Sequence, residues 1–268
     1  MPVISAVPVN EQGRFYHLDC GPGDIAPYIL TCGDPARARR LARHFETVEI
    51  RRRNREFVTI TGRYRGIPIT ALATGIGPDN TAIAVIEASQ AVSAATFIRL
   101  GTTGALQEHI ALGDLIITEQ AVRDENTTHY YAPPDFQALA HPAVLDALKK
   151  AAKELGVPYH LGVTCTTSDF YAGQGRTAPG FTCRDPGKVE RLRAAGVLNF
   201  EMEMSAYLTL ARISSLPLRA GGACVVLDNL VTRSETFSSR REKSKAITRL
   251  LRVGLRAVEI LYASDQKI

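Results

Sequence analysis

Several features are scarce in this sequence: it has no tryptophan, three methionines and five cysteines, and the cysteines form no C-x-x-C pair. An odd number of scattered cysteines argues against a disulfide framework and against a zinc site. No apolar run reaches the roughly 18 residues that a membrane span needs, and the first 14 residues lack the apolar segment of a signal peptide. We therefore expect reduced thiols, a cytoplasmic location and no membrane partner.

A strong charge of either sign is also missing, because 32 Lys and Arg residues against 27 Asp and Glu residues leave a net charge of +5. This excess suits acidic substrates or nucleic acid and does not decide between them. The one basic cluster is Arg51, Arg52, Arg53 and Arg55. Alternation along a strand would send these side chains to opposite faces, and no ladder of stacking aromatic residues accompanies them. We expect no nucleic-acid partner.

Predicted strands and helices alternate along the whole chain, with no linker-like stretch between them. This pattern predicts one α/β domain over 1–268, a three-layer α/β/α fold with a central mixed, largely parallel sheet, and a loosely ordered extension at 1–14. The expected strands are 27–32, 47–53, 58–64, 68–74, 95–100, 115–118, 159–166 and 218–227, and the expected helices are 36–45, 79–93, 141–155, 188–195, 205–213 and 243–263.

The stretch 97–104 (FIRLGTTG) is the centre of the sequence. Its apolar part predicts a buried strand, and Gly-Thr-Thr-Gly predicts a loop whose backbone amides can approach an anion closely. Arg99 lies inside the apolar part, where an unpaired guanidinium would be costly. Two partners fit Arg99: a bound anion, phosphate above all, or a carboxylate of the core.

A second anion site is predicted where Gly33-Asp34-Pro35 follows a short strand and opens a helix. Free amides point out of a helix N-terminus, and Arg37 in the first turn opposes the helix dipole unless an anion is bound. A solvent-facing Arg37 is the alternative. Polar residues also follow the predicted strands at Asp169 and Asp228, and ligands of open α/β sheets bind at such carboxyl ends.

Two further stretches carry chemistry. Glu201 and Glu203 flank Met202 where a helix begins; a glutamate there can bind two hydroxyls of a sugar, or it can simply pair with the helix dipole. The segment 172–186 is rich in Gly and Pro and long enough to be a lid or binding loop. The polar segment 233–241 is expected to be a mobile loop.

Six motifs, taken together in their order and spacing, resemble the nucleoside phosphorylase-I family, most of all its uridine-specific branch. They extend from about residue 17 to residue 228. The motifs are Gly33-Asp34-Pro35-x-Arg37, Arg55-Glu56-Phe57, Thr74-Gly75-Ile76-Gly77, Phe97-Ile98-Arg99-x-Gly101-Thr102-Thr103-Gly104, Phe170-Tyr171-x-Gly173-Gln174-x-Arg176 and Asn199-Phe200-Glu201-Met202-Glu203. The resemblance implies a cofactor-free pentosyltransferase that converts uridine and phosphate to uracil and ribose-1-phosphate through an oxocarbenium-like state.

The resemblance also implies a role for each matching residue. Phosphate would be bound by Gly33, Arg37, Arg99 and Thr102, with Arg55 from a neighbouring subunit. The ribose would be bound by Glu203 at its 2′- and 3′-hydroxyls, by Met202, and by the neighbour's His17 at the 5′-hydroxyl. The base would be bound by Phe170, Gln174 and Arg176, together with Thr103, Gly104, Phe200 and Glu201. Arg99, Glu203, Arg176 and Asp228 would be the catalytic residues.

Shared residues imply an oligomer. Because His17 and Arg55 would complete a neighbour's site, the resemblance implies a homo-oligomer built from dimers, a hexamer in many members of the family. Glu56 matches a position that can join a K⁺ site at the dimer interface.

Asp228 departs from the uridine-specific pattern, which usually has an arginine that helps to fix Arg176. An aspartate there resembles the purine branch, where it protonates or hydrogen-bonds ring nitrogen 7 of the departing base. Either Asp228 pairs with Arg176 in another way, or the enzyme is a purine or broad-specificity phosphorylase with Asp228 as general acid. Two other classes stay open: a nucleosidase, which would not need Arg37, Arg55 and Arg99 together, and a nucleoside-binding protein without turnover.

Overall fold

The computed structural model describes residues 7–232 and 239–267. The strands are β1 (Tyr28–Cys32), β2 (Thr47–Asn54), β3 (Phe57–Tyr64), β4 (Ile67–Ala73), β5 (Ala95–Ala105), β6 (Leu115–Asp124), β7 (Ala138–Leu139), β8 (Tyr159–Thr167), β9 (Asn199–Glu201) and β10 (Leu218–Asn229). The helices are α1 (Pro35–Ala42), α2 (Pro78–Ala91), α3 (Pro142–Glu154), α4 (Lys188–Ala194), α5 (Met204–Ile213) and α6 (Arg240–Asp265), with 3-10 turns η1 (Thr127–Tyr130) and η2 (Ala172–Gln174).

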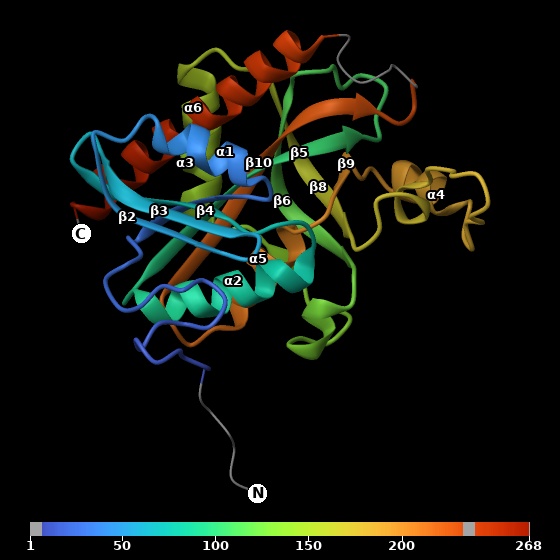
Figure 1. The fold of residues 1–268 in the computed structure, drawn as a ribbon. Coiled ribbons are helices and arrows are strands. Elements are labelled where there is room, and N and C mark those ends of the chain that lie inside the picture. Colours follow the sequence, from blue (N-terminus) through green and yellow to red (C-terminus); the bar gives the residue numbers. More distant parts are fainter. Residues whose placement is uncertain (1–6, 233–238, 268) are drawn as a thin grey trace, which may run out of the picture.

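The sheet lies between two layers of helices: α1, α3 and α6 cover one face, and α2 and α5 cover the other (Figure 1). Strands β4, β1, β5 and β10 run parallel to one another, as do β6, β8 and β9. The two groups meet antiparallel at β5–β9 and at β10–β6. The prediction of a three-layer fold with a mixed, largely parallel sheet is confirmed.

Five of the strands close on themselves. Because β5 pairs with both β10 and β9, the order β5-β10-β6-β8-β9 returns to β5, and β1, β4, β3 and β2 extend outward from that small barrel. Closure removes two free sheet edges, whose unpaired backbone groups would otherwise be exposed.

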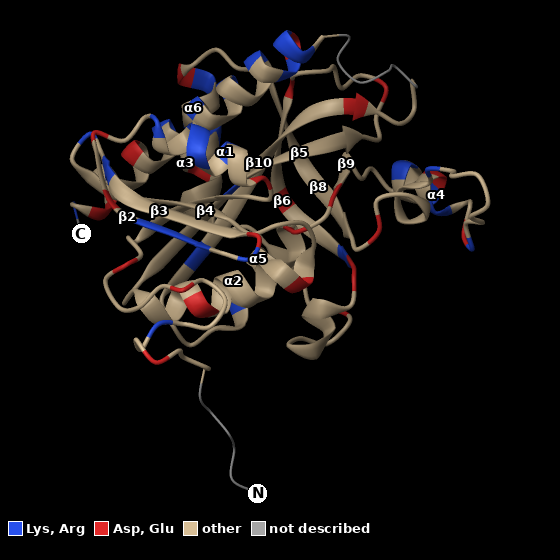
Figure 2. Ribbon diagram, in the orientation of Figure 1, with Lys and Arg blue, Asp and Glu red and all other residues tan. Residues whose placement is uncertain are grey.

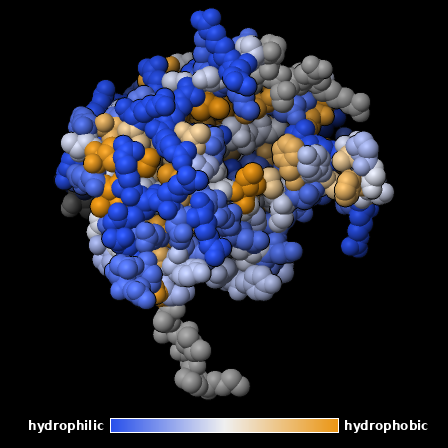
Figure 3. Space-filling model, in the orientation of Figure 1, coloured by the Kyte–Doolittle hydropathy of each residue, from blue (hydrophilic) through white to orange (hydrophobic). Residues whose placement is uncertain are grey.

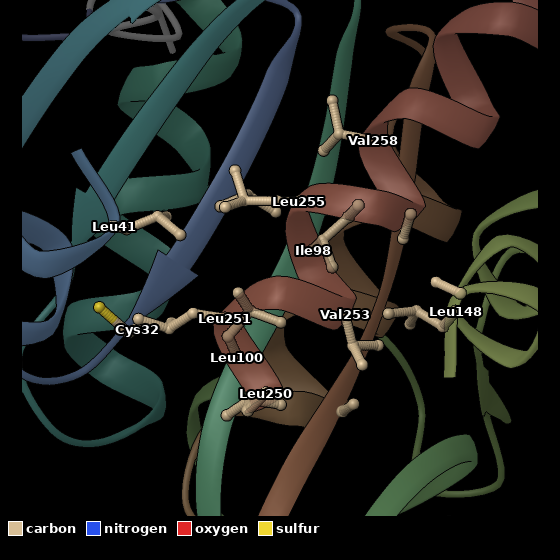
Figure 4. Close-up of a cluster of buried hydrophobic side chains, with 14 of the residues drawn as sticks. Cys32, Leu41, Ile98, Leu100, Leu148, Leu250, Leu251, Val253, Leu255 and Val258 are labelled. Carbon is tan, nitrogen blue, oxygen red and sulfur yellow. The ribbon is translucent and has the colours of Figure 1, made fainter. Parts of the chain in front are cut away.

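The larger apolar cluster lies under α6. Figure 4 shows Leu250, Leu251 and Leu255 of this helix directed at Ile98 and Leu100 of β5, in a cluster that also includes side chains of α1 and α3. A second apolar cluster lies on the other face of the sheet, under α2 and α5. Small and β-branched residues of β5 and β10 contribute to both clusters. Burial on both faces explains why these strands are apolar along most of their length.

The predicted Gly-Thr-Thr-Gly loop is wrong, because β5 continues through it to Ala105. Thr102 pairs with Val225 of β10, and Gly104 pairs with Phe200 of β9. Hydrogen bonds to two neighbouring strands therefore override the turn-like composition. For the same reason β6 extends to Asp124, beyond the predicted end at residue 118, since it stays paired with β8.

The starts of α2 and α6 differ from prediction. Helix α2 begins at Pro78 after Gly77, with no side-chain cap; Asp79 accepts a hydrogen bond from the Thr127 hydroxyl in η1 instead. Helix α6 already includes Arg240 and Arg241, which were predicted to lie in a loop, while residues 233–238 of that loop lie outside the described residues. The start of α1 agrees with prediction, because Asp34 caps it by accepting the Ala36 amide at 2.8 Å.

The basic cluster of β2 alternates as predicted: Arg51 and Arg53 are exposed, while Arg52 turns inward and lies 3.6 Å from a carboxylate oxygen of Asp24. On the face shown in Figure 3, hydrophobic residues form small, separate areas among hydrophilic ones. Of the helices in the described residues, none has the length and apolar character needed to cross a membrane.

The expected loose extension at 1–14 stays a prediction. Residues 1–6 lie outside the described residues. From residue 7 on, the segment is held by its neighbours: Val9 bridges to Phe15, and the Asn10 side chain donates to Asp19 at 2.9 Å.

Candidate active site

A cavity of about 840 Å³ opens at the carboxyl ends of β1, β5, β9 and β10. It gathers all of the predicted site residues except two: Gly33, Arg37, Glu56, Arg99, Thr102, Thr103, Gly104, Phe170, Gln174, Arg176, Phe200, Glu201, Met202, Glu203 and Asp228. The two that do not line it are His17 and Arg55, which were predicted to act in a neighbouring subunit. The structure thus brings together positions up to 195 residues apart in sequence.

Arg99 lies at the floor of the cavity and is 4% exposed. Its Nε donates to Glu201 at 2.8 Å, and its guanidinium forms an ion pair with Glu203. Burial lowers the pKa of Arg99, but the carboxylates of Glu203 and Glu201 outweigh burial, so the pKa is raised and the charge is retained. The sequence left open whether Arg99 pairs with a core carboxylate or with a bound anion. Arg99 does pair with the carboxylates of Glu201 and Glu203, and it also lines the cavity.

The Glu201 carboxylate holds the Arg99 guanidinium in position. Besides the guanidinium, its carboxylate accepts hydrogen bonds from the amides of Glu203 and Met204, each at 2.9 Å, and from the Thr166 hydroxyl. A carboxylate with that many donors is held in one position.

Glu203 combines burial with access to the cavity. It is 4% exposed, accepts the Gly77 amide at 2.8 Å and pairs with Arg99. Burial raises its pKa, Arg99 lowers it and Glu201 raises it again; the net effect is a raised pKa. Such a carboxylate can accept hydrogen bonds from ligand hydroxyls once it is ionised.

At the end of the cavity next to α1, the lining includes the Arg37 side chain and the backbone of two glycines, Gly33 and Gly75. Arg37 donates to the Leu100 carbonyl at 3.0 Å, and its buried Nε has no hydrogen-bond partner within 7–232 and 239–267. A Cβ at Gly33 would lie 2.9 Å from the Gly75 carbonyl oxygen, so this close approach of two loops requires glycine. This end can accept an anion.

At the other end, Arg176 pairs with Asp228 at 2.8 Å and stacks over Phe170, its guanidinium carbon 4.6 Å from the ring centre. A β-bulge between Val226 and Asp228 breaks the alternation of β10, which lets both Leu227 and Asp228 line the cavity. The sequence left two alternatives for Asp228, a pair with Arg176 or a general acid. The structure has the pair with Arg176. Gln174 lies buried beside them.

His17 and Arg55 lie close together on another surface. The His17 ring nitrogen Nδ1 lies 2.6 Å from the buried Glu87 carboxylate. The Arg55 guanidinium lies over the Tyr16 ring at 5.8 Å, and the Asn54 amide donates to the carbonyls of Tyr16 and His17. Both residues therefore belong to one patch, next to each other and outside their own subunit's cavity.

The family model described as "Phosphorylase superfamily" matches residues 27–259. The chain belongs to the phosphorylase superfamily.

Curated relatives from this superfamily cover most of the chain. The chain is 43% identical to a uridine phosphorylase of Thermococcus kodakarensis over 264 residues, which are 97% of this chain and 91% of the relative. It is 37% identical to the uridine phosphorylase of Escherichia coli, over 82% of this chain and 87% of the relative. A guanosine phosphorylase of Halorubrum lacusprofundi is 32% identical over 91% of this chain and 98% of the relative.

Sequence reasoning missed some residues that line the cavity of this phosphorylase-superfamily chain. Ile76, just before α2, Asn80, in its first turn, and Leu227, at the bulge, were given no role in the site, and neither was Lys243 of α6. Lys243 lies beyond every motif, at the start of the helix that the sequence predicts over 243–263 and to which no role in the site was assigned. No pattern in the sequence marked it.

Among the residues that the structure describes, no cluster of His, Cys, Asp and Glu could hold a metal ion. Burial raises the pKa of Cys32 to about 11 and that of Cys224 to about 12, so both are neutral thiols near pH 7. The K⁺ site at Glu56 stays a prediction.

Proposed function

We propose that this protein is a uridine phosphorylase, which converts uridine and phosphate to uracil and ribose-1-phosphate. One observation carries the proposal: Arg37 and Arg99, the buried Glu203, and the Gln174–Arg176 pair all line one cavity. The names of the relatives from Thermococcus kodakarensis and Escherichia coli support the same activity.

The reaction demands positioning and charge more than covalent chemistry. Phosphate forms a bond to C1′ of the ribose while the bond from C1′ to the base nitrogen breaks, through an oxocarbenium-like state. Arg37 and Arg99 would hold the phosphate, as guanidinium groups suit phosphate geometry. Glu203 would accept the 2′- and 3′-hydroxyls, with Met202 against the sugar. Placing the nucleophile under C1′ is then the main contribution of these residues.

Negative charge develops on the base as it leaves. Gln174 and Arg176 would donate hydrogen bonds to the uracil edge and stabilise that charge, while Phe170 stacks on the ring. Since the Gln174 side chain and the Arg176 Nε are buried, a base that cannot accept their hydrogen bonds would leave them unpaired and be rejected. Arg176 has a buried Nε without a partner in the described part of the chain, which supports a ligand contact there.

A purine phosphorylase is the second candidate, because Asp228 lines the cavity and one relative is a guanosine phosphorylase. The Arg176–Asp228 pair favours uridine, since it commits the carboxylate to Arg176. The test is a panel of uridine, thymidine, inosine, guanosine and adenosine at saturating phosphate, with base release measured. Uridine should give the highest kcat/KM; a purine nucleoside at the top would replace the proposal with the purine candidate.

We also propose that the oligomer is built from dimers that share His17 and Arg55, with a hexamer as the expected assembly and the cytoplasm as the expected location. The closeness of these two residues on one surface supports the sharing. Sedimentation velocity tests the assembly. A monomer at micromolar concentration that is fully active would contradict it.

A further inference from the structure

The positive charges of the cavity are unequally available to a ligand. Arg99 faces the two carboxylates of Glu201 and Glu203, and Arg176 faces Asp228. Two other cations line the same cavity, Arg37 and Lys243. Neither forms an ion pair with a carboxylate within residues 7–232 and 239–267. These two charges are therefore the ones left to balance a bound anion.

Lys243 lies at the same end of the cavity as Arg37. The Arg40 guanidinium donates to the Ser244 carbonyl at 2.9 Å and to the Thr248 hydroxyl, which fixes the first turns of α6 beside α1. Arg37 precedes Arg40 by one helical turn on α1, and Lys243 precedes Ser244 on α6. Figure 2 shows the blue of Lys and Arg on both α1 and the start of α6.

The first turn of α6 is electrostatically unfavourable on its own. Arg240, Arg241 and Lys243 all lie there, against a single acid, Glu242. Cations near a helix N-terminus oppose the helix dipole. A bound anion beside Lys243 would remove part of that cost, just as it would for Arg37 at the start of α1.

We propose that Lys243 is a further phosphate-binding residue of this site, acting together with Arg37. The inference rests on the proposed function. A dianion needs two positive charges, and Arg99 supplies little net charge because two carboxylates surround it. The ammonium of Lys243 acts as a point charge on a flexible stem, which suits a group at the open rim of the cavity, where Lys243 is exposed.

The experiment compares Lys243→Met with Lys245→Met, a control on the same turn of α6 that is also exposed but does not line the cavity. Lys243→Met should raise the KM for phosphate about fivefold and change the KM for uridine less than twofold. The rise should shrink as salt increases, since an exposed charge is screened. Lys243→Arg should keep most of the wild-type phosphate affinity, and Lys245→Met should match the wild type.

A second readout does not depend on turnover: the increase in melting temperature caused by inorganic phosphate. It should be smaller in Lys243→Met than in the wild type and in Lys245→Met. Equal phosphate KM and equal stabilisation in Lys243→Met and the wild type would overturn the inference while leaving the phosphorylase assignment intact. A wild type that phosphate stabilises but that releases no uracil would overturn the proposed function instead.

Discussion

At the scale of single residues, the site is a set of charges that hold one another in place. The Glu201 carboxylate accepts hydrogen bonds from Arg99, from Thr166 and from two backbone amides. It thereby holds the Arg99 guanidinium in place in the cavity. Removing Arg99 would leave two buried carboxylates without a counter-charge, which costs about 3–5 kcal/mol of stability in comparable cases. Arg37 is the better probe of phosphate binding, because it has no carboxylate partner in the described residues.

We predict that Arg37→Gln raises the KM for phosphate more than tenfold and leaves the melting temperature nearly unchanged, since the wild-type side chain gives one hydrogen bond to the Leu100 carbonyl. Arg39→Gln, an exposed change on the same helix, is the control and should behave as the wild type. Steady-state kinetics with varied phosphate measures both. An unchanged phosphate KM in Arg37→Gln would mean that the phosphate site lies elsewhere.

A double-mutant cycle tests whether Asp228 acts by holding Arg176. The two side chains form an ion pair at 2.8 Å, so Asp228→Asn should lower kcat/KM for uridine about tenfold by freeing Arg176. Adding Asp228→Asn to Arg176→Gln should then cost little more, because coupled residues do not add. Fully additive losses, or a loss confined to purine nucleosides, would instead point to Asp228 as an acid.

The raised pKa of Glu203 leads to a pH prediction. A carboxyl with a raised pKa stays protonated to a higher pH than usual, and only the carboxylate can accept both ribose hydroxyls. We expect kcat/KM for uridine to fall, as the pH decreases, through an apparent pKa above 4.5, the ordinary value for a glutamate. Glu203→Gln should lose this limb and also discriminate less between uridine and 2′-deoxyuridine. An acid limb at or below the ordinary value in the wild type would contradict the argument.

At the scale of secondary-structure elements, local signals predicted the starts and ends that local chemistry decides. One example is the start of α1 at Asp34-Pro35. Another is the turn between β3 and β4, where Arg65 has a φ of 51° and Gly66 a φ of 75°. The Gly-Thr-Thr-Gly segment was wrongly predicted to be a loop, because Gly101 is needed for lack of space and not for a turn. A Cβ at this position would lie 2.9 Å from the Arg99 guanidinium and 2.5 Å from the Cys224 sulfur. The shorter of these contacts is to β10, far away in the sequence, so no local pattern reveals it.

Asp265 ties the end of α6 to the sheet. Asp265 accepts two hydrogen bonds from Arg219, on β10, and one from the Tyr28 hydroxyl, on β1. Arg219 is the main cause of the lowered pKa of Asp265. The ionised carboxylate therefore stabilises the fold at neutral pH, and this contribution is lost as the pH falls through the folded-state pKa, below 3.8.

We predict that Asp265→Asn lowers the free energy of unfolding by about 1 kcal/mol at pH 7, and that the difference from the wild type disappears at strongly acidic pH. Urea unfolding across a pH series measures it. Asp146→Asn, which removes an exposed carboxylate from α3, is the matched control and should have almost no effect. A difference that persists or grows at low pH would show that the anchor does not work through the charge of Asp265.

At the scale of the whole molecule, most of the sequence motifs lie at or just after the end of a strand. The parallel strands β1, β4, β5 and β10 bring their carboxyl ends to one place, and the antiparallel pairing of β9 with β5 adds Phe200 there. Two features of the site escaped prediction. The barrel closure between β5, β9 and β10 depends on pairings of distant segments. Lys243 reaches the cavity because α6 crosses back over the sheet beside α1, a packing that composition alone does not encode.

The central claim is that one cavity holds phosphate against the ribose of a bound uridine. The most direct measurement follows uracil and sugar release from uridine as inorganic phosphate is raised from zero. The account predicts negligible release without phosphate, saturation as phosphate increases, and one ribose-1-phosphate for each uracil. Release at an equal rate without phosphate, with free ribose as the sugar product, would contradict it.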